Sequence, residues 1–189
     1  DFASADPHLD RDRIALFGHS RFGKAALLAA ALDPRIAAVI ANQSGRLGAA
    51  PSSDPMGEPL PSLLSHFPHW FPVEARAAAA QSESLDQQLL LALIAPRPVL
   101  LGGASLDRWS DPAGAFQSAR SASAVYRLFG GTGLDQPSMK ATNLDADIAY
   151  YFRSGGHGVR RSDWSNATAF LDRQFAARPR ALSRSVESQ

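Results

Sequence analysis

An apolar run, a glycine-flanked serine and an alanine-rich segment follow one another near the start of this chain and strongly limit how it can fold. Residues 14–17 read Ile-Ala-Leu-Phe, residues 18–24 read Gly-His-Ser-Arg-Phe-Gly-Lys, and residues 25–30 read Ala-Ala-Leu-Leu-Ala-Ala. The run predicts a strand at about 13–18, and the alanine-rich segment predicts a helix at about 21–32. A serine on the sharp turn between such elements projects its hydroxyl from the backbone, as in a nucleophile elbow.

The pattern by itself leaves two interpretations of Ser20 open. In the usual elbow a glycine stands two residues after the serine, whereas here Phe22 holds that position and Gly23 follows it. Serine is also a favoured residue at the N-cap of a helix. Ser20 is therefore either a nucleophile or a capping residue, and the rest of the chain must decide.

Strand and helix signals alternate along the chain, which predicts an α/β fold with a mostly parallel sheet flanked by helices. Residues 43–80 are rich in Gly, Pro, Ser and aromatic residues, which indicates a long functional loop with short helices. Residues 179–189 are polar and aperiodic, and we expect a disordered C-terminal tail there. The remaining expected strands are 36–41, 98–103 and 148–152, and the remaining expected helices are 84–94, 112–129 and 164–176.

The composition argues against several functional classes. The 189 residues suit one domain, and a net charge of +1 gives no support to nucleic-acid binding. Every apolar run is broken well short of a transmembrane span, so no membrane partner is expected. The absence of cysteine excludes disulfides and Cys-ligated metal sites. No metal or organic cofactor is implied, and the sequence does not reveal the oligomeric state.

A hydrolytic serine needs a base and an acid, and this chain offers both after later strands. Asp107 follows the third expected strand, and His157 lies in a glycine-rich turn after the fourth. Ser20, Asp107 and His157 thus occur in the chain order of α/β-hydrolase triads. The alternative interpretation of Asp107 is that it is a turn-forming residue. Asp111 stands directly before Pro112, which is typical of a helix N-cap.

Three further histidines have simpler explanations. His19 packs or hydrogen-bonds beside the elbow in the interpretation that we favour. His66 and His69 flank Phe67-Pro68. Metal ligation by that pair is conceivable, but no acidic cluster lies nearby in the sequence, so packing within the loop is the preferred interpretation.

These residues resemble the glucuronoyl esterases, especially their bacterial branch. The matches run from about residue 12 to about residue 175. The Ser-Arg-x-Gly-Lys elbow and the Asp-x-Trp-x-Asp-Pro loop are specific to that group. The segments that carry the resemblance are Gly18-x-Ser20-Arg21-x-Gly23-Lys24, Gln43-Ser44-Gly45, Phe67-Pro68-His69-Trp70-Phe71, Ala95-Pro96-Arg97-Pro98, Asp107-x-Trp109-x-Asp111-Pro112 and Gly155-Gly156-His157-Gly158.

The resemblance implies an α/β-hydrolase that cleaves the ester between 4-O-methyl-glucuronic acid on glucuronoxylan and lignin alcohols. It implies Ser20 as the nucleophile, His157 as the general base and Asp107 as the residue that orients His157. Arg21 would stabilise the oxyanion. The residues that would bind the uronate ester are Lys24, Gln43, Glu58 and Trp109. A secreted or periplasmic location is expected from the resemblance alone.

Three of these residues have purely structural alternatives. Arg21 and Lys24 could simply be solvated on the surface of the helix, and Trp109 could lie in the core. Many family members carry the triad acid as Glu in a Gln-Glu-Ser-Gly segment, where this chain has Asn42-Gln43-Ser44-Gly45. The amide of Gln43 cannot serve as that anion, so the resemblance passes the duty to Asp107.

The position of the elbow sets a further expectation. The elbow strand is the fifth of eight strands in an α/β-hydrolase. We therefore expect residues 1–178 to form a partial catalytic domain, from the elbow strand onward. Another α/β-hydrolase, such as an acetyl xylan esterase or a prolyl-oligopeptidase-like peptidase, is one alternative. A carbohydrate-binding remnant that performs no chemistry is the other.

Overall fold

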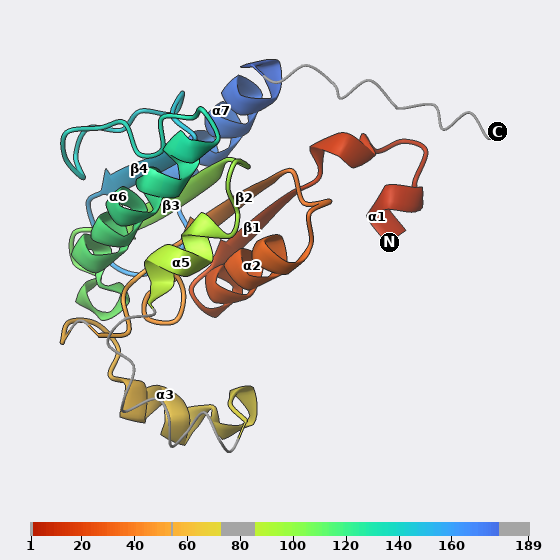
Figure 1. Cartoon of the computed structure of the whole chain (residues 1–189). Coiled ribbons are helices and arrows are strands. Elements are labelled where there is room, and N and C mark those ends of the chain that lie inside the picture. The colour runs from red at the N-terminus through yellow and green to blue at the C-terminus, as the bar shows by residue number, and fades with distance from the viewer. Residues whose placement is uncertain (1, 54, 73–85, 178–189) are drawn as a thin grey trace.

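The computed structural model describes residues 2–53, 55–72 and 86–177, which contain a four-stranded parallel sheet (Figure 1). The strands β1 (Ala15–His19), β2 (Ala38–Asn42), β3 (Val99–Ala104) and β4 (Ile148–Arg153) lie side by side in chain order. Helix α2 (Arg21–Leu32) connects β1 to β2, α5 (Gln87–Ala92) precedes β3, α6 (Pro112–Leu128) connects β3 to β4, and α7 (Arg161–Ala177) follows β4. The predicted alternation of strands and helices is confirmed.

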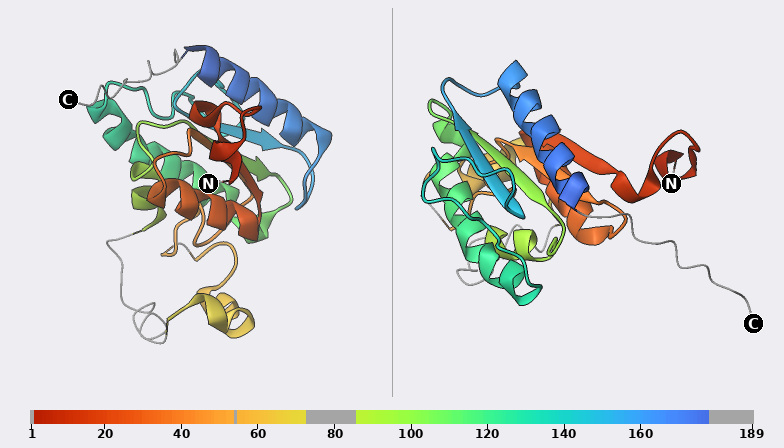
Figure 2. Two further views of the ribbon diagram at one scale, coloured as in Figure 1. Left: turned by 90° about the vertical axis from the view of Figure 1, so that its right-hand side faces the viewer. Right: turned by 90° about the horizontal axis from the view of Figure 1, so that it is seen from above.

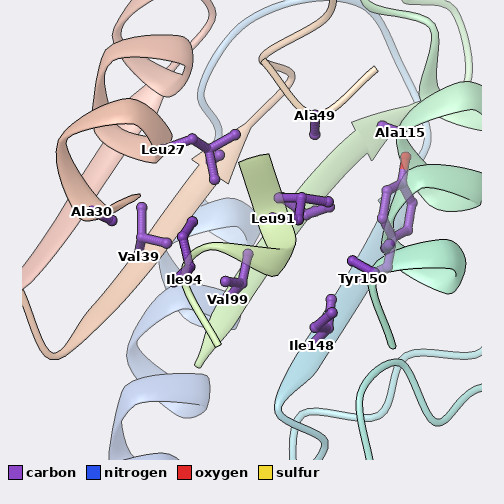
Figure 3. Close-up of a cluster of buried hydrophobic side chains, with 14 of the residues drawn as sticks. Leu27, Ala30, Val39, Ala49, Leu91, Ile94, Val99, Ala115, Ile148 and Tyr150 are labelled. Atoms are coloured by element: carbon purple, nitrogen blue, oxygen red, sulfur yellow. The ribbon is translucent and has the colours of Figure 1, made fainter. Parts of the chain in front are cut away.

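Side chains that alternate along the strands form two hydrophobic layers, one on each face of the sheet. On one face, Val39, Val99 and Tyr150 pack with α2, α5 and α6, as Figure 3 shows. On the other face, Ile40 and Leu100 join Ala167 and Phe170 of α7. Figure 2 shows α7 on the side of the sheet opposite α5 and α6. Burial on both faces explains why the strands read as continuous apolar runs.

Short elements fill the connections. Helix α1 (Phe2–Ala5) and the 3-10 turn η1 (Arg11–Arg13) precede β1, and η3 (Arg108–Ser110) follows β3. Within the long loop after β2, α3 (Leu60–His66) and η2 (Pro68–Trp70) lie away from the sheet (Figure 1). The expected short helices of this loop are therefore present, although residues 54 and 73–80 lie outside the described residues.

Several element boundaries differ from those expected. Strand β2 begins at Ala38 rather than at residue 36, because the Arg97 guanidinium takes the carbonyl oxygens of Asp33 and Ile36 at 2.9 Å each. Helix α7 begins at residue 161 rather than 164. Residues 84 and 85 of the expected helix 84–94, and the expected tail 179–189, lie outside the described residues. None of the described helices is long and apolar enough to cross a membrane.

Candidate active site

Ser20 lies on the turn between β1 and α2 in a backbone conformation that non-glycine residues rarely adopt, with φ 56° and ψ −121°. Its backbone N–H donates to the carbonyl of Asn42 at 2.9 Å. Gly18 permits the turn, because a Cβ there would lie 2.1 Å from the carbonyl oxygen of Phe22. The Ser20 side chain makes no capping hydrogen bond to α2, so the capping interpretation of this serine is wrong.

Asp107 and His157 form a hydrogen-bonded pair beside the elbow. His157 Nδ1 lies 2.8 Å from Asp107 Oδ2, and the Asp107 side chain is almost fully buried while the imidazole is partly exposed. Burial opposes ionisation of Asp107, but hydrogen bonds from His157 and Ser110 outweigh it, so the pKa of this carboxyl is lowered. An anionic Asp107 holds the proton of His157 on Nδ1 and leaves Nε2 to act as a base.

The imidazole of His157 lies next to the elbow. Its ring centroid is 4.5 Å from that of His19, the residue directly before Ser20. Burial and the neighbouring His157 lower the pKa of His19. Ser20 and His157 are not hydrogen-bonded to each other in this structure.

Asp111 has a different partner from Asp107. Its backbone is left-handed, with φ 44°, and its carboxylate accepts a hydrogen bond from Gly114 N at 2.9 Å. This contact caps the first turn of α6 and confirms the expected N-cap.

Arg21 and Glu58 lie at the first turn of α2. Arg21 Nη2 is 3.8 Å from Glu58 Oε1, and the guanidinium carbon lies 4.2 Å from the centre of the Phe67 ring. Glu58 is buried, and its N–H donates to the carbonyl of Trp109 at 2.9 Å. A half-exposed guanidinium is thus held between a carboxylate and an aromatic face, so Arg21 is not simply solvated on the helix.

Lys24 follows one turn later on α2, and its ammonium donates to the carbonyls of Ser44, at 2.7 Å, and Arg46. Burial lowers the pKa of Lys24 to about 8, against the opposing attraction of Glu58. The alternative of a solvated Lys24 is therefore wrong. Two of the three N–H donors of the ammonium bind backbone within the described residues.

A cavity of about 750 Å³ opens beside α2. Its lining combines the cations of Arg21 and Lys24 with mostly apolar side chains from α2, from the loop after β2 and from α5: Phe22, Ala25, Leu28, Leu47, Trp70, Phe71, Gln87 and Leu90.

The two other residues expected to bind substrate lie in contrasting surroundings. Trp109 is 55% exposed, so the alternative of a core tryptophan is wrong. Gln43 is buried, and its Oε1 accepts a hydrogen bond from Gly158 N at 3.0 Å, directly after His157. The structure thus places Gln43 beneath the loop that carries the imidazole.

His66 and His69 lie in α3 and η2, within the loop after β2. His66 Nδ1 lies 2.8 Å from the carbonyl oxygen of Ser62 in its own helix, and His69 packs edge-on against Trp70. Among the described residues, no group of three or more His, Asp or Glu side chains is placed to hold a metal ion.

Two charged residues that sequence reasoning did not single out, Arg153 and Asp163, lie beneath the His157 loop. Arg153 could have been noticed as a cation at a strand end before a glycine-rich turn. Asp163 carries no such signal, because its contact with Arg153 depends on the packing of α7.

Comparison with known proteins gives consistent matches. Residues 2–130 match a family model described as glucuronyl esterase, fungi. A carbohydrate esterase, MZ0003, from an unknown prokaryotic organism is 40% identical over 176 residues, covering 91% of this chain and 41% of that protein. The 4-O-methyl-glucuronoyl methylesterase 1 of Phanerochaete chrysosporium is 30% identical over 131 residues, covering 65% of this chain and 28% of that protein.

A solved structure also matches this chain. The glucuronoyl esterase from Solibacter usitatus superposes with a TM-score of 0.84 at 37% identity, covering 93% of this chain and 46% of that one. This likeness confirms the predicted α/β-hydrolase fold class. The chain spans less than half the length of each of these three proteins.

Proposed function

The chain belongs to the glucuronoyl esterase family, and from this premise we propose that it carries the Ser-His-Asp triad of an esterase for 4-O-methyl-glucuronoyl esters. The observation that carries the proposal is the 2.8 Å contact between His157 Nδ1 and Asp107 Oδ2, beside a serine in an elbow conformation. Ser20 is the nucleophile, His157 the general base and Asp107 the residue that orients it.

The chemistry runs in two steps. His157 Nε2 accepts the hydroxyl proton as Ser20 Oγ attacks the uronate carbonyl carbon, and the carbonyl π electrons move to oxygen. The oxyanion re-forms the carbonyl, the C–O bond to the alcohol breaks, and the alcohol leaves with the proton from His157. Water then attacks the acyl-serine by the same route in reverse, which releases the uronic acid and restores Ser20.

The first turn of α2 supplies the positive potential that the oxyanion requires. The N-terminus of a helix carries partial positive charge and free N–H groups, and Arg21 adds a full positive charge there. Glu58 and Phe67 restrain the Arg21 guanidinium, so little of its freedom remains to be lost in the transition state.

The substrate-binding roles follow from the same surroundings. Two N–H donors of the Lys24 ammonium bind backbone carbonyls, and Lys24 lines the cavity beside α2, so we assign its third donor to a sugar oxygen. The exposed face of Trp109 offers a flat apolar surface on which a sugar ring can stack. Gln43 contributes to substrate binding indirectly, because its Oε1 accepts the N–H of Gly158 and so supports the loop that carries His157.

The experiment is hydrolysis of benzyl glucuronate by the purified chain beside Ser20→Ala, with circular dichroism on the same samples. Ser121→Ala is the matched control, since Ser121 is exposed on α6. The proposal predicts turnover in the wild-type chain and in Ser121→Ala and none in Ser20→Ala. It also predicts fluorophosphonate labelling at Ser20. A folded chain that neither turns over the ester nor labels would favour a binding role without chemistry.

A further inference from the structure

The loop that carries His157 contains three glycines, and two of them have open space around them. Gly155 and Gly158 adopt left-handed backbone conformations, with φ +103° and +136°. A Cβ added at Gly156 or Gly158 would meet no atom within 4 Å. Glycine loses more conformational freedom on ordering than any other residue. The glycines have no side chains that could pack, so polar contacts to the backbone are needed to order this part of the chain.

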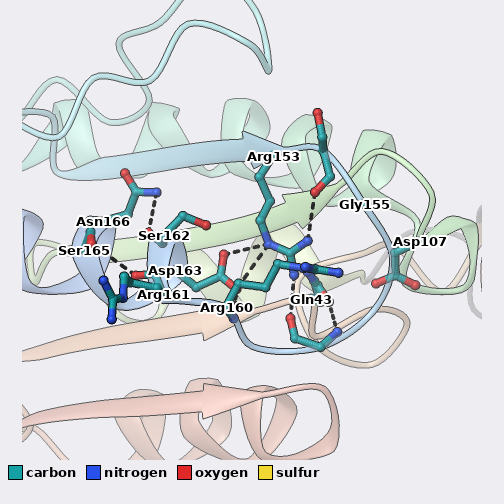
Figure 4. Close-up of polar contacts among 12 residues, drawn as sticks. Gln43, Asp107, Arg153, Gly155, Arg160, Arg161, Ser162, Asp163, Ser165 and Asn166 are labelled. Carbon is teal, nitrogen blue, oxygen red and sulfur yellow. Dashed lines mark hydrogen bonds and ion pairs between the residues drawn. The ribbon is translucent and has the colours of Figure 1, made fainter.

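Arg153, at the end of β4, supplies three such contacts. Its guanidinium donates to the carbonyls of Ser154 and Gly156, at 3.2 Å each, and to the carbonyl of Gly158. These carbonyls surround His157 on both sides in the chain. Figure 4 shows Arg153 reaching from β4 toward the loop and toward Asp163.

Asp163, in the first turn of α7, fixes the guanidinium from the other side. Its Oδ1 and Oδ2 lie 2.8 and 3.1 Å from Arg153 Nε, and its side chain has no exposed surface. The carboxylate also accepts the N–H of Arg160 at 2.8 Å, which caps α7. Arg153 is thereby clamped between a helix that packs on the sheet and the loop that it organises.

Three neutral contacts hold the same loop. Gly155 N donates to Ser105 Oγ at 3.2 Å, Leu106 N donates to the carbonyl of Gly155 at 2.9 Å, and Gly158 N donates to Gln43 Oε1 at 3.0 Å. Among the described residues, the imidazole has one hydrogen-bond partner, Asp107. A displacement of the loop by about 1 Å would break that alignment, and misplacement on this scale can cost roughly a hundredfold in rate.

We propose that Arg153, held by Asp163, is a positioning residue for His157, an inference that rests on the role of His157 in the proposed function. The guanidinium suits this task because its planar fork carries five N–H donors in fixed directions. A lysine keeps the charge opposite Asp163, but it has three donors at a single point and cannot span the carboxylate and three carbonyls.

The test compares Arg153→Lys with the wild-type chain in esterase kinetics and in one-dimensional proton NMR. The NMR readout is the low-field resonance of the His157 Nδ1 proton shared with Asp107, assigned by its loss in His157→Gln. We expect Arg153→Lys to keep the circular dichroism spectrum and KM, to lower kcat by about ten- to a hundredfold, and to broaden or lose the resonance. Arg173→Lys is the matched control, because Arg173 pairs with Asp145 at 2.7 Å on the exposed surface.

A second variant guards against a simple loss of folding. Arg153→Met/Asp163→Leu removes both buried charges together, a change that proteins often tolerate, and we expect it to lose the resonance as well. The proposal is overturned if both variants keep kcat and the resonance, or if the folded wild-type chain lacks the resonance. Loss of the resonance in the variants supports the proposal even where the wild-type chain shows no Ser20-dependent turnover, and only the proposed function then fails.

Discussion

The carboxylates of Asp107 and Asp111 lie in the same loop after β3 but bind different partners. Asp107 accepts from His157 at 2.8 Å, whereas Asp111 accepts from Gly114 N at 2.9 Å and caps α6. Their order in the chain cannot assign the triad acid, but these contacts give each residue a distinct role that can be tested by the same conservative substitution.

We expect Asp107→Asn to lower kcat by roughly 10⁴-fold with the fold retained, because an amide does not stabilise the imidazolium and favours the wrong tautomer of His157. Asp111→Asn should leave both rate and stability nearly unchanged, because asparagine is a good N-cap and tolerates the left-handed backbone. Esterase kinetics with thermal denaturation of both variants make the comparison. A greater loss of rate in Asp111→Asn would reverse the assignment.

Lys24 gives a prediction of pH dependence, because burial lowers its pKa to about 8. Above that pH the neutral amine has two N–H donors, and both are occupied by the carbonyls of Ser44 and Arg46. We therefore expect KM for benzyl glucuronate to rise as the pH passes through about 8, after subtraction of the Ser20→Ala background.

Lys24→Met should raise KM by about tenfold at neutral pH, a typical effect of losing one hydrogen bond to a charged group, and should abolish the rise above pH 8. Lys140→Met is the matched control, since Lys140 is the other lysine of the chain and is exposed. A pH profile of KM that is identical in Lys24→Met and the wild-type chain would remove Lys24 from substrate binding.

At the scale of elements, β1 and α2 are joined by the elbow. The backbone of Phe22 in α2 comes so close to residue 18 that no side chain fits there. We expect Gly18→Ala to destabilise the chain by about 1–3 kcal/mol, because the added Cβ would lie 2.1 Å from the Phe22 carbonyl oxygen. Gly156→Ala is the control, because it has open space and no left-handed φ. Urea denaturation measures both. Equal stabilities of the two variants would mean that the elbow relaxes freely.

The elements, and the places of the proposed triad residues after successive strands, could be predicted because their signals are local. Each strand is a short apolar run, and Ser20, Asp107 and His157 each follow a strand, so a parallel sheet brings them to one edge. The contacts between distant segments could not be predicted in this way. Lys24 binds carbonyls 20 and 22 residues away, and the guanidinium of Arg97 shortens β2 at its start.

The start of α7 could not be predicted either, because it also depends on contacts between distant segments. The polar segment before Trp164 reads as loop, and the helix begins earlier, at Arg161. Asp163 is buried in this first turn, where its carboxylate meets Arg153 of β4. That contact arises only when α7 packs on the sheet, so no local sequence pattern predicts it.

At the scale of the whole molecule, α2 carries exposed apolar side chains and packs against β1, which lies at the edge of the described sheet. Strand β1 has β2 as its one neighbour in the described sheet. On α2, Leu28 and Leu32 lie one turn apart and are 53% and 76% exposed, and Leu28 also lines the cavity of about 750 Å³. An edge strand beside an apolar patch is a site at which chains associate.

We expect this chain to self-associate at micromolar concentrations, and Leu28→Glu/Leu32→Glu to shift it toward monomer in sedimentation velocity, because two carboxylates on one helix face oppose burial of that face. Leu128→Glu is the matched control: Leu128 is 84% exposed, but it lies on α6, away from β1. Association that persists in the double variant would place the contact elsewhere. A wild-type chain that stays monomeric at the highest soluble concentration would mean that side chains along α2 already shield the β1 edge.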